Sequence, residues 1–212
     1  MEVALVTGAS SGMGLIYAGM LAQKGYNILL VSNQRQELEE AASEIREKYG
    51  VTAIARYQDL AEKDAARELY DYCHVEGLEV EVLVNNAGMF FFKELCAEDL
   101  PRVEKMLSLH VLTITGLSLL FGEDMRRRGR GHILIVSSMA SRLPTPGITV
   151  YSATKAYLKS FGKSLHFEMK PYGVGVTTVC PAAIATPLYG ISPKLMDFFL
   201  KLGIIKTPEW LV

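Results

Sequence analysis

The sequence predicts one three-layer α/β/α domain, in which a doubly wound parallel sheet lies between two layers of helices. Short apolar runs alternate with helical patterns along the chain, as they do in repeated β-α units. The first run, Val3–Val6, leads into a glycine-rich turn and then into a helical pattern. Half of the 212 residues are apolar, which is ample for a single core. Right-handed crossovers then place helices on both faces of the sheet.

The expected elements follow one another without a linker, a repeat or a low-complexity tract, so we expect one domain over residues 1–212. The expected strands span residues 2–7, 26–32, 51–57, 80–85, 131–137 and 174–180. The expected helices lie near residues 12–24, 35–48, 61–75, 99–127 and 151–170. Thr207, Pro208 and Glu209 have the residue types of a helix start. The sequence stops three residues later and no seventh strand follows, so we expect the final strand to be missing.

Composition argues against several classes of function. The net charge of −1 gives no reason to expect a nucleic acid or a membrane surface as partner. The basic cluster Arg126–Arg130 ends a predicted helix, where cations offset the helix dipole. Cys73, Cys96 and Cys180 lie far apart without C-x-x-C spacing, which argues against disulfides and a metal site and for a reducing compartment. We find no room for a signal peptide and expect no transmembrane segment, so we expect a cytoplasmic protein.

A glycine-rich turn follows the first strand. After Thr7, glycines at 8, 12 and 14 give T-G-x-x-x-G-x-G, which differs from the G-x-G-x-x-G of the common dinucleotide fingerprint. The N-terminus of the following helix points backbone N–H groups outward, and glycines let a phosphate approach the backbone closely. Glycines also occur at turns that bind nothing, so the turn predicts a pyrophosphate site only together with the motifs downstream.

Polar residues also end two later strands. Residues 85–88 (Asn-Asn-Ala-Gly) end the fourth expected strand, and Ser138 follows the fifth. The carboxyl ends of parallel strands form the edge at which doubly wound sheets bind ligands. We therefore expect these residues beside the glycine-rich turn.

Tyr151 and Lys155 begin the last expected helix, where residues four apart lie one turn from each other on one face. A lysine charge about 4 Å from a phenol contributes about 4 kcal/mol at an effective dielectric constant near 20. At about 1.36 kcal/mol per unit, this energy lowers the pKa of a tyrosine from about 10 toward about 7, where it can exchange protons. An isolated Y-x-x-x-K is common, but with Ser138 and both glycine-containing motifs upstream it predicts an acid/base pair.

Together these motifs resemble those of the classical short-chain dehydrogenases/reductases, and the resemblance covers nearly the whole chain. It implies a Rossmann-like fold and an NAD(P)-dependent oxidoreductase. Residues 144–155 and 173–181 are most similar to the hydroxysteroid dehydrogenase and 3-ketoacyl reductase branch. The motifs that carry the resemblance are Thr7-Gly8-x-x-x-Gly12-x-Gly14, Asn85-Asn86-Ala87-Gly88, Ser138, Tyr151-x-x-x-Lys155 and Pro181-x-x-x-x-Thr186, with Asp59 at the family's acidic contact to adenine.

The resemblance implies a role for each catalytic residue. Tyr151 would be the general acid in reduction, or the base in oxidation, at the substrate oxygen. Lys155 would lower the pKa of Tyr151 and hold the nicotinamide ribose, and Ser138 would hydrogen-bond the substrate carbonyl. Thr186 would hold the nicotinamide carboxamide, and the cofactor would supply the hydride.

The same resemblance implies a set of cofactor contacts along the carboxyl edge of the sheet, followed by a substrate lid at about 187–206. The expected cofactor-binding residues are Gly8, Ser10, Ser11, Gly12, Met13, Gly14, Ser32, Asn33, Arg35, Asp59, Leu60, Asn86, Ala87, Gly88, Tyr151, Lys155, Pro181, Ile184 and Thr186.

Two positions depart from the family pattern. His110 stands where the family usually carries an asparagine that helps to hold a water-linked proton relay. A neutral imidazole can pass protons, so His110 is a candidate catalytic residue, but a lone histidine in an apolar helix is also often a satisfied core residue. Ala182 replaces the usual glycine after Pro181, a small change unless that backbone needs a positive φ.

The end of the second strand predicts NADP(H) as the preferred cofactor. The region has no acid to bind a ribose 2′-hydroxyl or repel a 2′-phosphate. Ser32 and Asn33 can donate hydrogen bonds to a 2′-phosphate, and Arg35 can pair with it. NAD(H) stays possible for two reasons. Arg35 lies two positions later than the arginine that this family often carries, and an arginine at the start of a helix is often simply exposed to solvent.

Apolar residues around the expected site predict a small apolar carbonyl or alcohol as substrate, with steroid, acyl thioester, retinoid and xenobiotic all open. The run 195–200 suits a lid, a subunit contact or a membrane-surface helix. As is usual in this family, we expect helices 99–127 and 151–170 to join subunits in a homodimer or homotetramer. The other apolar residues are Met89–Phe92, Met139, Leu143, Leu188 and Tyr189.

Two other classes stay open. His110, Ala182 and the abrupt end of the sequence suit a cofactor-binding or interaction protein without turnover, although such a protein has no need of the Ser138, Tyr151 and Lys155 present here. An epimerase or dehydratase of the same superfamily is the third class, but those enzymes are usually longer, with a C-terminal substrate domain.

Overall fold

The computed structural model describes residues 1–182 and 188. Within them, six parallel strands form one sheet in the order β3-β2-β1-β4-β5-β6. This order reverses direction between β1 and β4, and such a reversal opens a crevice at the carboxyl ends of the strands. The strands are β1 (Glu2–Thr7), β2 (Asn27–Ser32), β3 (Ala53–Tyr57), β4 (Glu79–Asn85), β5 (Gly131–Val136) and β6 (Val174–Val179).

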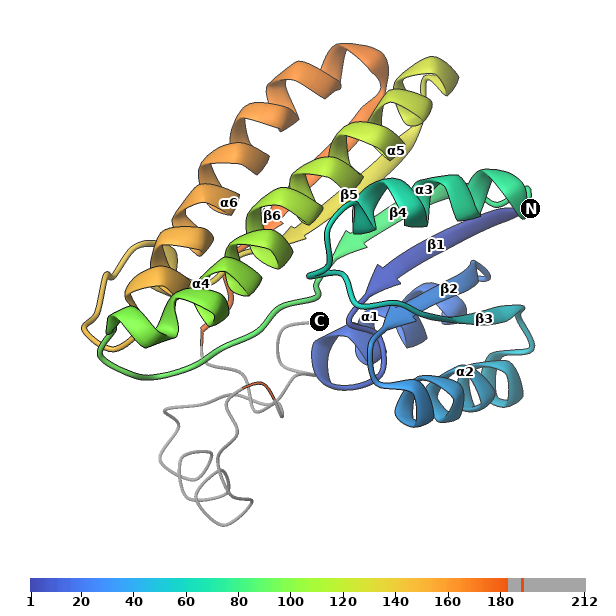
Figure 1. The fold of residues 1–212 in the computed structure, drawn as a ribbon. Coiled ribbons are helices and arrows are strands. Elements are labelled where there is room, and N and C mark those ends of the chain that lie inside the picture. The colour runs from blue at the N-terminus through green and yellow to red at the C-terminus, as the bar shows by residue number, and fades with distance from the viewer. Residues whose placement is uncertain (183–187, 189–212) are drawn as a thin grey trace.

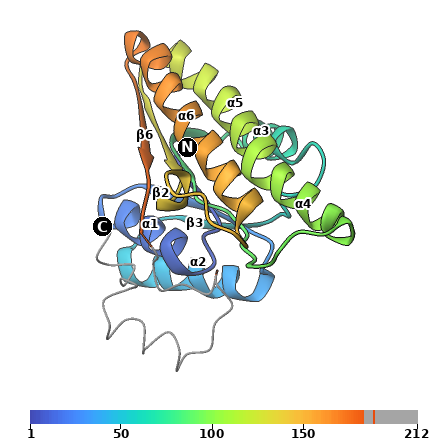
Figure 2. The ribbon, with the colours of Figure 1, turned by 90° about the vertical axis from the view of Figure 1, so that its left-hand side faces the viewer.

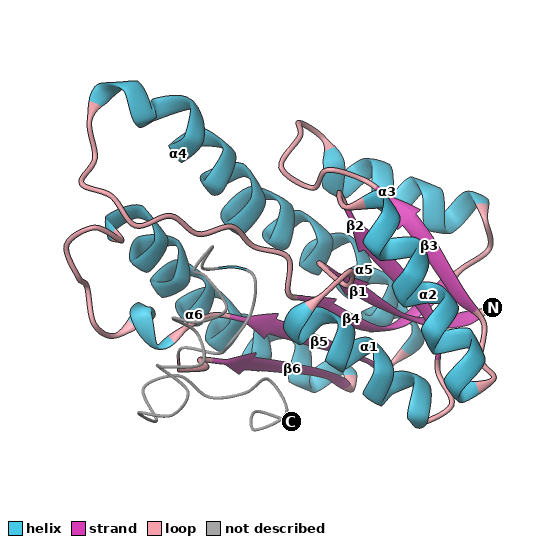
Figure 3. Cartoon of the chain, turned by 90° about the horizontal axis from the view of Figure 1, so that it is seen from below, coloured by secondary structure: helices cyan, strands magenta, loops and turns pink. Residues whose placement is uncertain are grey.

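Helices cover both faces of the sheet (Figure 1, Figure 2). Helices α1 (Gly12–Gln23) and α2 (Arg35–Tyr49) pack on one face. The view from below separates these two helices from those on the opposite side of the strands (Figure 3). The helices of the opposite layer are α3 (Ala65–Val75), α4 (Leu100–Leu107), α5 (Ile114–Arg128) and α6 (Thr149–Met169).

The unbroken apolar run of β1 has a direct explanation in the packing. Val3 and Leu5 belong to the core cluster under α3, α5 and α6, whereas Ala4 and Val6 belong to the cluster under α1 and α2. All four side chains are fully buried. Successive residues of a strand face opposite sides, so a strand covered on both faces needs apolar residues at every position. The predicted three-layer, doubly wound sheet is thereby confirmed.

Two expected helices differ in detail from the prediction. The helix expected from residue 61 begins at Ala65, because Asp64 has a φ of +61°, which is incompatible with a continuing α-helix. The helix expected over 99–127 is present but is divided: α4 and α5 are joined by a π-helical segment, Ser108–Thr113. Residues 207–209 and the expected lid lie outside the described residues, apart from Leu188.

The helical run Ala97–Arg128 is long and apolar enough, by length and composition alone, to cross a membrane. Core helices of soluble domains pass the same test, and here the run packs against the sheet and contributes Leu117, Phe121 and Met125 to the core. It is weak evidence for a membrane span.

Candidate active site

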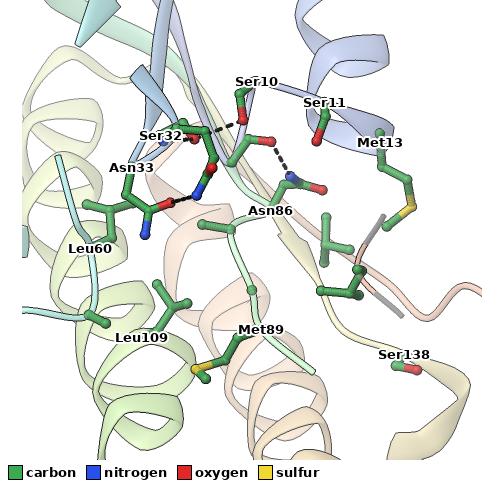
Figure 4. Close-up of a pocket in the computed structure, with 18 of the residues that line it drawn as sticks. Ser10, Ser11, Met13, Ser32, Asn33, Leu60, Asn86, Met89, Leu109 and Ser138 are labelled. Carbon is green, nitrogen blue, oxygen red and sulfur yellow. Dashed lines mark hydrogen bonds between the residues drawn. The ribbon is translucent and has the colours of Figure 1, made fainter. Parts of the chain in front are cut away.

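A cleft of about 450 Å³ opens at the carboxyl edge of the sheet, and motifs far apart in the sequence line it together (Figure 4). Gly14, Arg35 and His110 do not line it, and Ile184 and Thr186 fall outside the described residues. The expected site residues that line the cleft are Gly8, Ser10, Ser11, Gly12, Met13, Ser32, Asn33, Asp59, Leu60, Asn86, Ala87, Gly88, Ser138, Tyr151, Lys155 and Pro181.

The glycine-rich turn is packed so tightly that two of its glycines cannot carry a side chain. Gly8 has a φ of +65°, and a Cβ there would lie 2.9 Å from the Ala87 Cα. A Cβ on Gly14 would lie 2.0 Å from the Gly8 carbonyl oxygen. Gly8 also donates its N–H to the Val31 carbonyl at 2.8 Å. The turn is therefore held with bare backbone facing the cleft, which is what close approach of a phosphate requires.

Thr7 and Asn86 join this turn to the end of β4. The Thr7 Oγ1 accepts the N–H groups of Asn86 and Ala87, both at 3.0 Å, and donates to the Val84 carbonyl at 3.1 Å. The Asn86 side-chain amide donates to the carbonyls of Thr7 and Gly8 at 2.9 and 3.3 Å. The first amide, Asn85, instead points into the core and donates to Ser118. The two motifs are thus one rigid unit across the switch point of the sheet.

Lys155 lies at the base of the cleft with only 4% of its surface exposed. Its Nζ donates to the Val136 carbonyl at 2.9 Å, and Ser137 Oγ donates to the Lys155 carbonyl at 2.7 Å. Burial lowers the pKa of Lys155 to about 8. The side chain therefore still carries its charge at neutral pH, in a place where that charge is weakly screened.

Tyr151 lies on α6 one turn before Lys155, whose Nζ is 5.6 Å from the centroid of the tyrosine ring. The rings of Phe90 and His110 pack edge-on against Tyr151, with centroids at 5.0 and 5.9 Å. Ser138 lines the same cleft, and its Oγ accepts the Ala140 N–H at 3.1 Å. Because Ser138 is the acceptor in this bond, its hydroxyl hydrogen can still be donated to another group.

His110 is fully buried in the π-helical segment, and both of its ring nitrogens have partners. The Nε2 accepts the Met89 N–H at 2.9 Å, so the ring hydrogen must be on Nδ1. That nitrogen lies 2.9 Å from Thr154 Oγ1, which in turn donates to the Tyr151 carbonyl at 2.8 Å. Burial, and then the charge of Lys155, hold the pKa of His110 well below its usual value. The histidine is a neutral residue that connects the loop after β4, the π-helical segment and α6.

The far end of the cleft, beyond β2, has no acid on the strand end itself. Ser10 and Ser32 lie there with their hydroxyls 2.9 Å apart, and Figure 4 shows Asn33 beside them. The Arg35 guanidinium is stacked 4.3 Å from the centroid of the Tyr57 ring. Among non-glycine residues in the described part of the chain, only Asp64 has a positive φ, so Ala182 is in an ordinary backbone conformation.

Several lining residues escaped sequence reasoning. Lys105 is one of them, and it forms an ion pair with Asp59 at 2.9 Å. Leu109 lines the same region, one turn after Lys105. No sequence motif marks this lysine and this leucine, because both residue types are common on amphipathic helices. They reach the cleft only because their helix packs beside the end of β3.

The arrangement fits a dinucleotide. The glycine cradle would be filled by any Cβ, the N-terminus of α1 faces it, and the cleft extends from there along both halves of the sheet. The fold and site thus define a dinucleotide-binding α/β domain with a serine, a tyrosine and a lysine on one wall.

Comparison with known proteins gives the family. A family model described as short chain dehydrogenase matches residues 2–193, and this chain belongs to that family. The chain is 36% identical over 200 residues to the very-long-chain 3-oxoacyl-CoA reductase of Anas platyrhynchos, covering 92% of this chain and 63% of the relative. It is 32% identical over 189 residues to the 17-beta-hydroxysteroid dehydrogenase type 3 of Mus musculus, covering 87% of this chain and 61% of the relative.

A solved structure gives the same result. The short-chain dehydrogenase from Sphingobium yanoikuyae in complex with NADPH has a TM-score of 0.83 to this chain at 26% identity, covering 98% of this chain and 88% of that one. The chain spans less than two thirds of the length of the two curated relatives named above. The predicted family is confirmed, and the relatives agree with the hydroxysteroid and ketoacyl branch.

Proposed function

We propose that this chain is the catalytic domain of an NADP(H)-dependent oxidoreductase that interconverts an apolar carbonyl and its secondary alcohol. One observation carries this proposal. Ser138, Tyr151 and Lys155 line the same cleft as the glycine-rich turn. A protein that only bound the dinucleotide would have no need of a buried lysine charge beside a tyrosine.

Each residue has a chemical task in this proposal. The Lys155 charge stabilises the ionised form of the Tyr151 phenol, so that Tyr151 can give a proton to the substrate oxygen or take one from it. The Ser138 hydroxyl donates a hydrogen bond to the same oxygen and fixes it beside Tyr151. A bound nicotinamide would supply or accept the hydride. His110 remains a candidate for the proton relay, and its two hydrogen bonds support a role in holding Tyr151 and Met89 in place.

The preference for NADP(H) is supported by the absence of an acid at the end of β2. Ser10, Ser32 and Asn33 offer hydroxyl and amide groups to a 2′-phosphate, and no described carboxylate follows Ser32 directly. Arg35 lies on the neighbouring Tyr57, where it can contribute positive charge near that phosphate. NAD(H) is the competing cofactor in the test below.

For the substrate we propose a 3-oxoacyl thioester, with a steroid ketone as the second choice. The names of the curated relatives support this choice, and so do the apolar residues Met89 and Leu188 in the lining of the cleft. Phe90 packs on Tyr151, so apolar surface continues beside the expected reaction centre.

We also propose a homodimer or homotetramer in the cytoplasm. Large apolar side chains are exposed on α6 and on the helix that includes the π-helical segment, among them Leu112 at 68%, Leu119 at 55% and Phe167 at 64%. Light scattering on a size-exclusion column tests the assembly, and fractionation of cells tests the location. A monomer at micromolar concentration would overturn the first proposal.

The decisive experiment follows NADPH and NADH oxidation with 3-oxoacyl-CoA and steroid ketones, for wild type, Tyr151→Phe and Tyr157→Phe. The control variant loses the same hydroxyl from the same helix at an exposed position. We expect Tyr151→Phe to lose at least about 100-fold in turnover, while NADPH affinity stays within about twofold. Turnover retained in Tyr151→Phe would refute its role. Cofactor binding by the wild type without any turnover would favour the cofactor-binding protein instead.

A further inference from the structure

The π-helical segment Ser108–Thr113 makes contacts at both ends of the cleft, and its role as inferred below rests on the proposed cofactor binding. The pyrophosphate belongs at the glycine-rich turn after β1. Ser138, Tyr151 and Lys155 lie on the β5 and α6 side and mark the nicotinamide end. The adenosine half then extends toward the ends of β2 and β3, where Leu60 lines the cleft.

At the adenosine end, two hydroxyl groups of the π-helical segment hold the loop that follows β3. Thr113 Oγ1 donates to the Leu60 carbonyl at 2.7 Å, and this hydrogen bond is buried. Ser108 Oγ donates to the next carbonyl, that of Ala61, also at 2.7 Å. Leu60 and Ala61 line the cleft, and so does Leu109 of the π-helical segment, which Figure 4 shows on the same side as Leu60. A ligand that packs on this wall therefore contacts the loop and the π-helical segment at the same time.

At the reaction centre, the same segment contacts Tyr151 through His110. The His110 Nε2 accepts the Met89 N–H, and its Nδ1 lies 2.9 Å from Thr154 Oγ1. Thr154 in turn donates to the Tyr151 carbonyl at 2.8 Å. The His110 ring also packs edge-on against the Tyr151 ring, with the two centroids 5.9 Å apart. The position of the Tyr151 phenol therefore depends on where the π-helical segment places His110.

A π-helical turn has an alternative arrangement, because the same residues can form an α-helix. An α-helix pairs backbone groups four residues apart and a π-helix five apart, so the side chains would point in other directions. The bonds from Ser108 and Thr113 to the loop hold the π-helical arrangement. A bound adenosine half covers apolar surface of Leu60 and Leu109 together, so it favours the state in which the loop and the segment are in contact.

We propose that Ser108 and Thr113 are positioning residues: they transmit the binding of the adenosine half of the cofactor to Tyr151, through the π-helical segment and His110. With the adenosine half bound, Tyr151 is held in its reactive position for a larger fraction of the time. Binding energy from a part of the cofactor that takes no part in the chemistry then raises turnover as well as affinity. The two ends of the cleft are coupled, and a divided cofactor measures the coupling.

The test uses the two halves of the cofactor as separate molecules. Reduced nicotinamide mononucleotide supplies the hydride, and AMP or adenosine 2′,5′-bisphosphate is added as the second fragment. The ketone is a 3-oxoacyl thioester of N-acetylcysteamine, because coenzyme A carries an adenosine of its own. In wild type, we expect a saturating adenosine fragment to raise kcat with the mononucleotide about fivefold or more. A fragment that only lowers the KM of the mononucleotide would overturn the proposal.

Two variants test the hydroxyl groups themselves. Ser108→Ala and Thr113→Val should each reduce the activation to about twofold or less, because each removes one hydrogen bond to the loop, while the fragment still competes with NADPH for binding. Thr113→Ser keeps the hydroxyl and should keep the activation. Thr115→Val is the matched control, since the Thr115 hydroxyl lies 2.9 Å from that of Tyr157 on α6 and not against the loop. It should leave the activation unchanged.

Activation retained in both Ser108→Ala and Thr113→Val would show that these residues only stabilise the loop, and would overturn the proposal. Thermal unfolding followed by circular dichroism establishes that each variant is folded; if Thr113→Val does not fold, Ser108→Ala decides the test. Wild type that oxidises NADPH but is not activated by the fragment would overturn the proposal too, and leave the proposed function intact. Wild type that oxidises NADPH with no ketone would refute the proposed function itself.

Discussion

Replacing His110 by glutamine should change how the stability of the protein depends on pH. In the folded protein the imidazole is neutral, because Nε2 accepts the Met89 N–H and the buried ring has a pKa well below its usual value. In the unfolded chain it titrates near pH 6.5. Above about pH 6.5 both states are neutral, so His110 adds no pH dependence. Below it, the unfolded chain takes up a proton that the folded protein does not.

The size of the effect follows from that single proton. Wild type should lose about 1.4 kcal/mol of unfolding free energy per pH unit relative to His110→Gln, or about 2 kcal/mol from pH 6.5 to pH 5.0. Glutamine reaches about as far from the backbone as Nε2, so it can still accept from Met89, but it does not titrate. At pH 7.5 it should cost about 1 kcal/mol, because the hydrogen bond to Thr154 is lost.

Urea unfolding followed by circular dichroism at five values between pH 5.0 and pH 7.5 measures the effect. The sequence has four histidines, and the other three are present in both proteins, so their titration cancels in the difference. Curves that stay parallel over the whole range would refute the reasoning, since His110 would then take up its proton in the folded protein as readily as in the unfolded chain.

Three further predictions concern the walls of the cleft. Gly14→Ala should abolish NADPH binding in a fluorescence titration and cost about 1–3 kcal/mol, because its Cβ would lie 2.0 Å from the Gly8 carbonyl oxygen. Thr7→Val should lower the unfolding free energy in urea by about 2–4 kcal/mol, since two backbone N–H groups lose their acceptor. Lys155→Met should abolish turnover but raise stability at pH 7 by about 1–3 kcal/mol, because burial lowers the lysine pKa to about 8. That gain should shrink as the pH rises from about 8 to about 10.5, where the unfolded chain retains a proton that the folded lysine has lost.

The layers of the fold and most of the cleft could be predicted from the sequence because their signals are local. The apolar run Val3–Val6 indicates that both faces of β1 are covered. The glycines after it are needed because a Cβ at Gly8 or Gly14 would collide with neighbouring backbone atoms. No local sequence pattern predicted that Lys105 lines the cleft. Its place beside Asp59 depends on how a helix packs more than forty residues later in the chain, and spacing along the helix does not contain that information.

The π-helical segment explains how one helix reaches both ends of the cleft. In an α-helix, Ser108 and Thr113 would point about 140° apart, because successive residues turn by about 100°. A π-helix pairs residues five apart, so these two side chains face the same way. Both then donate to neighbouring carbonyls of the loop after β3, while His110 between them binds Met89 and α6. The hydrophobic spacing of residues 99–127 fits an ordinary helix equally well, so this change of direction could be found only in the structure. Because the π-helical segment contacts both regions, we expect a substitution at His110 to disturb the position of Tyr151 and also that of the Asp59–Lys105 pair.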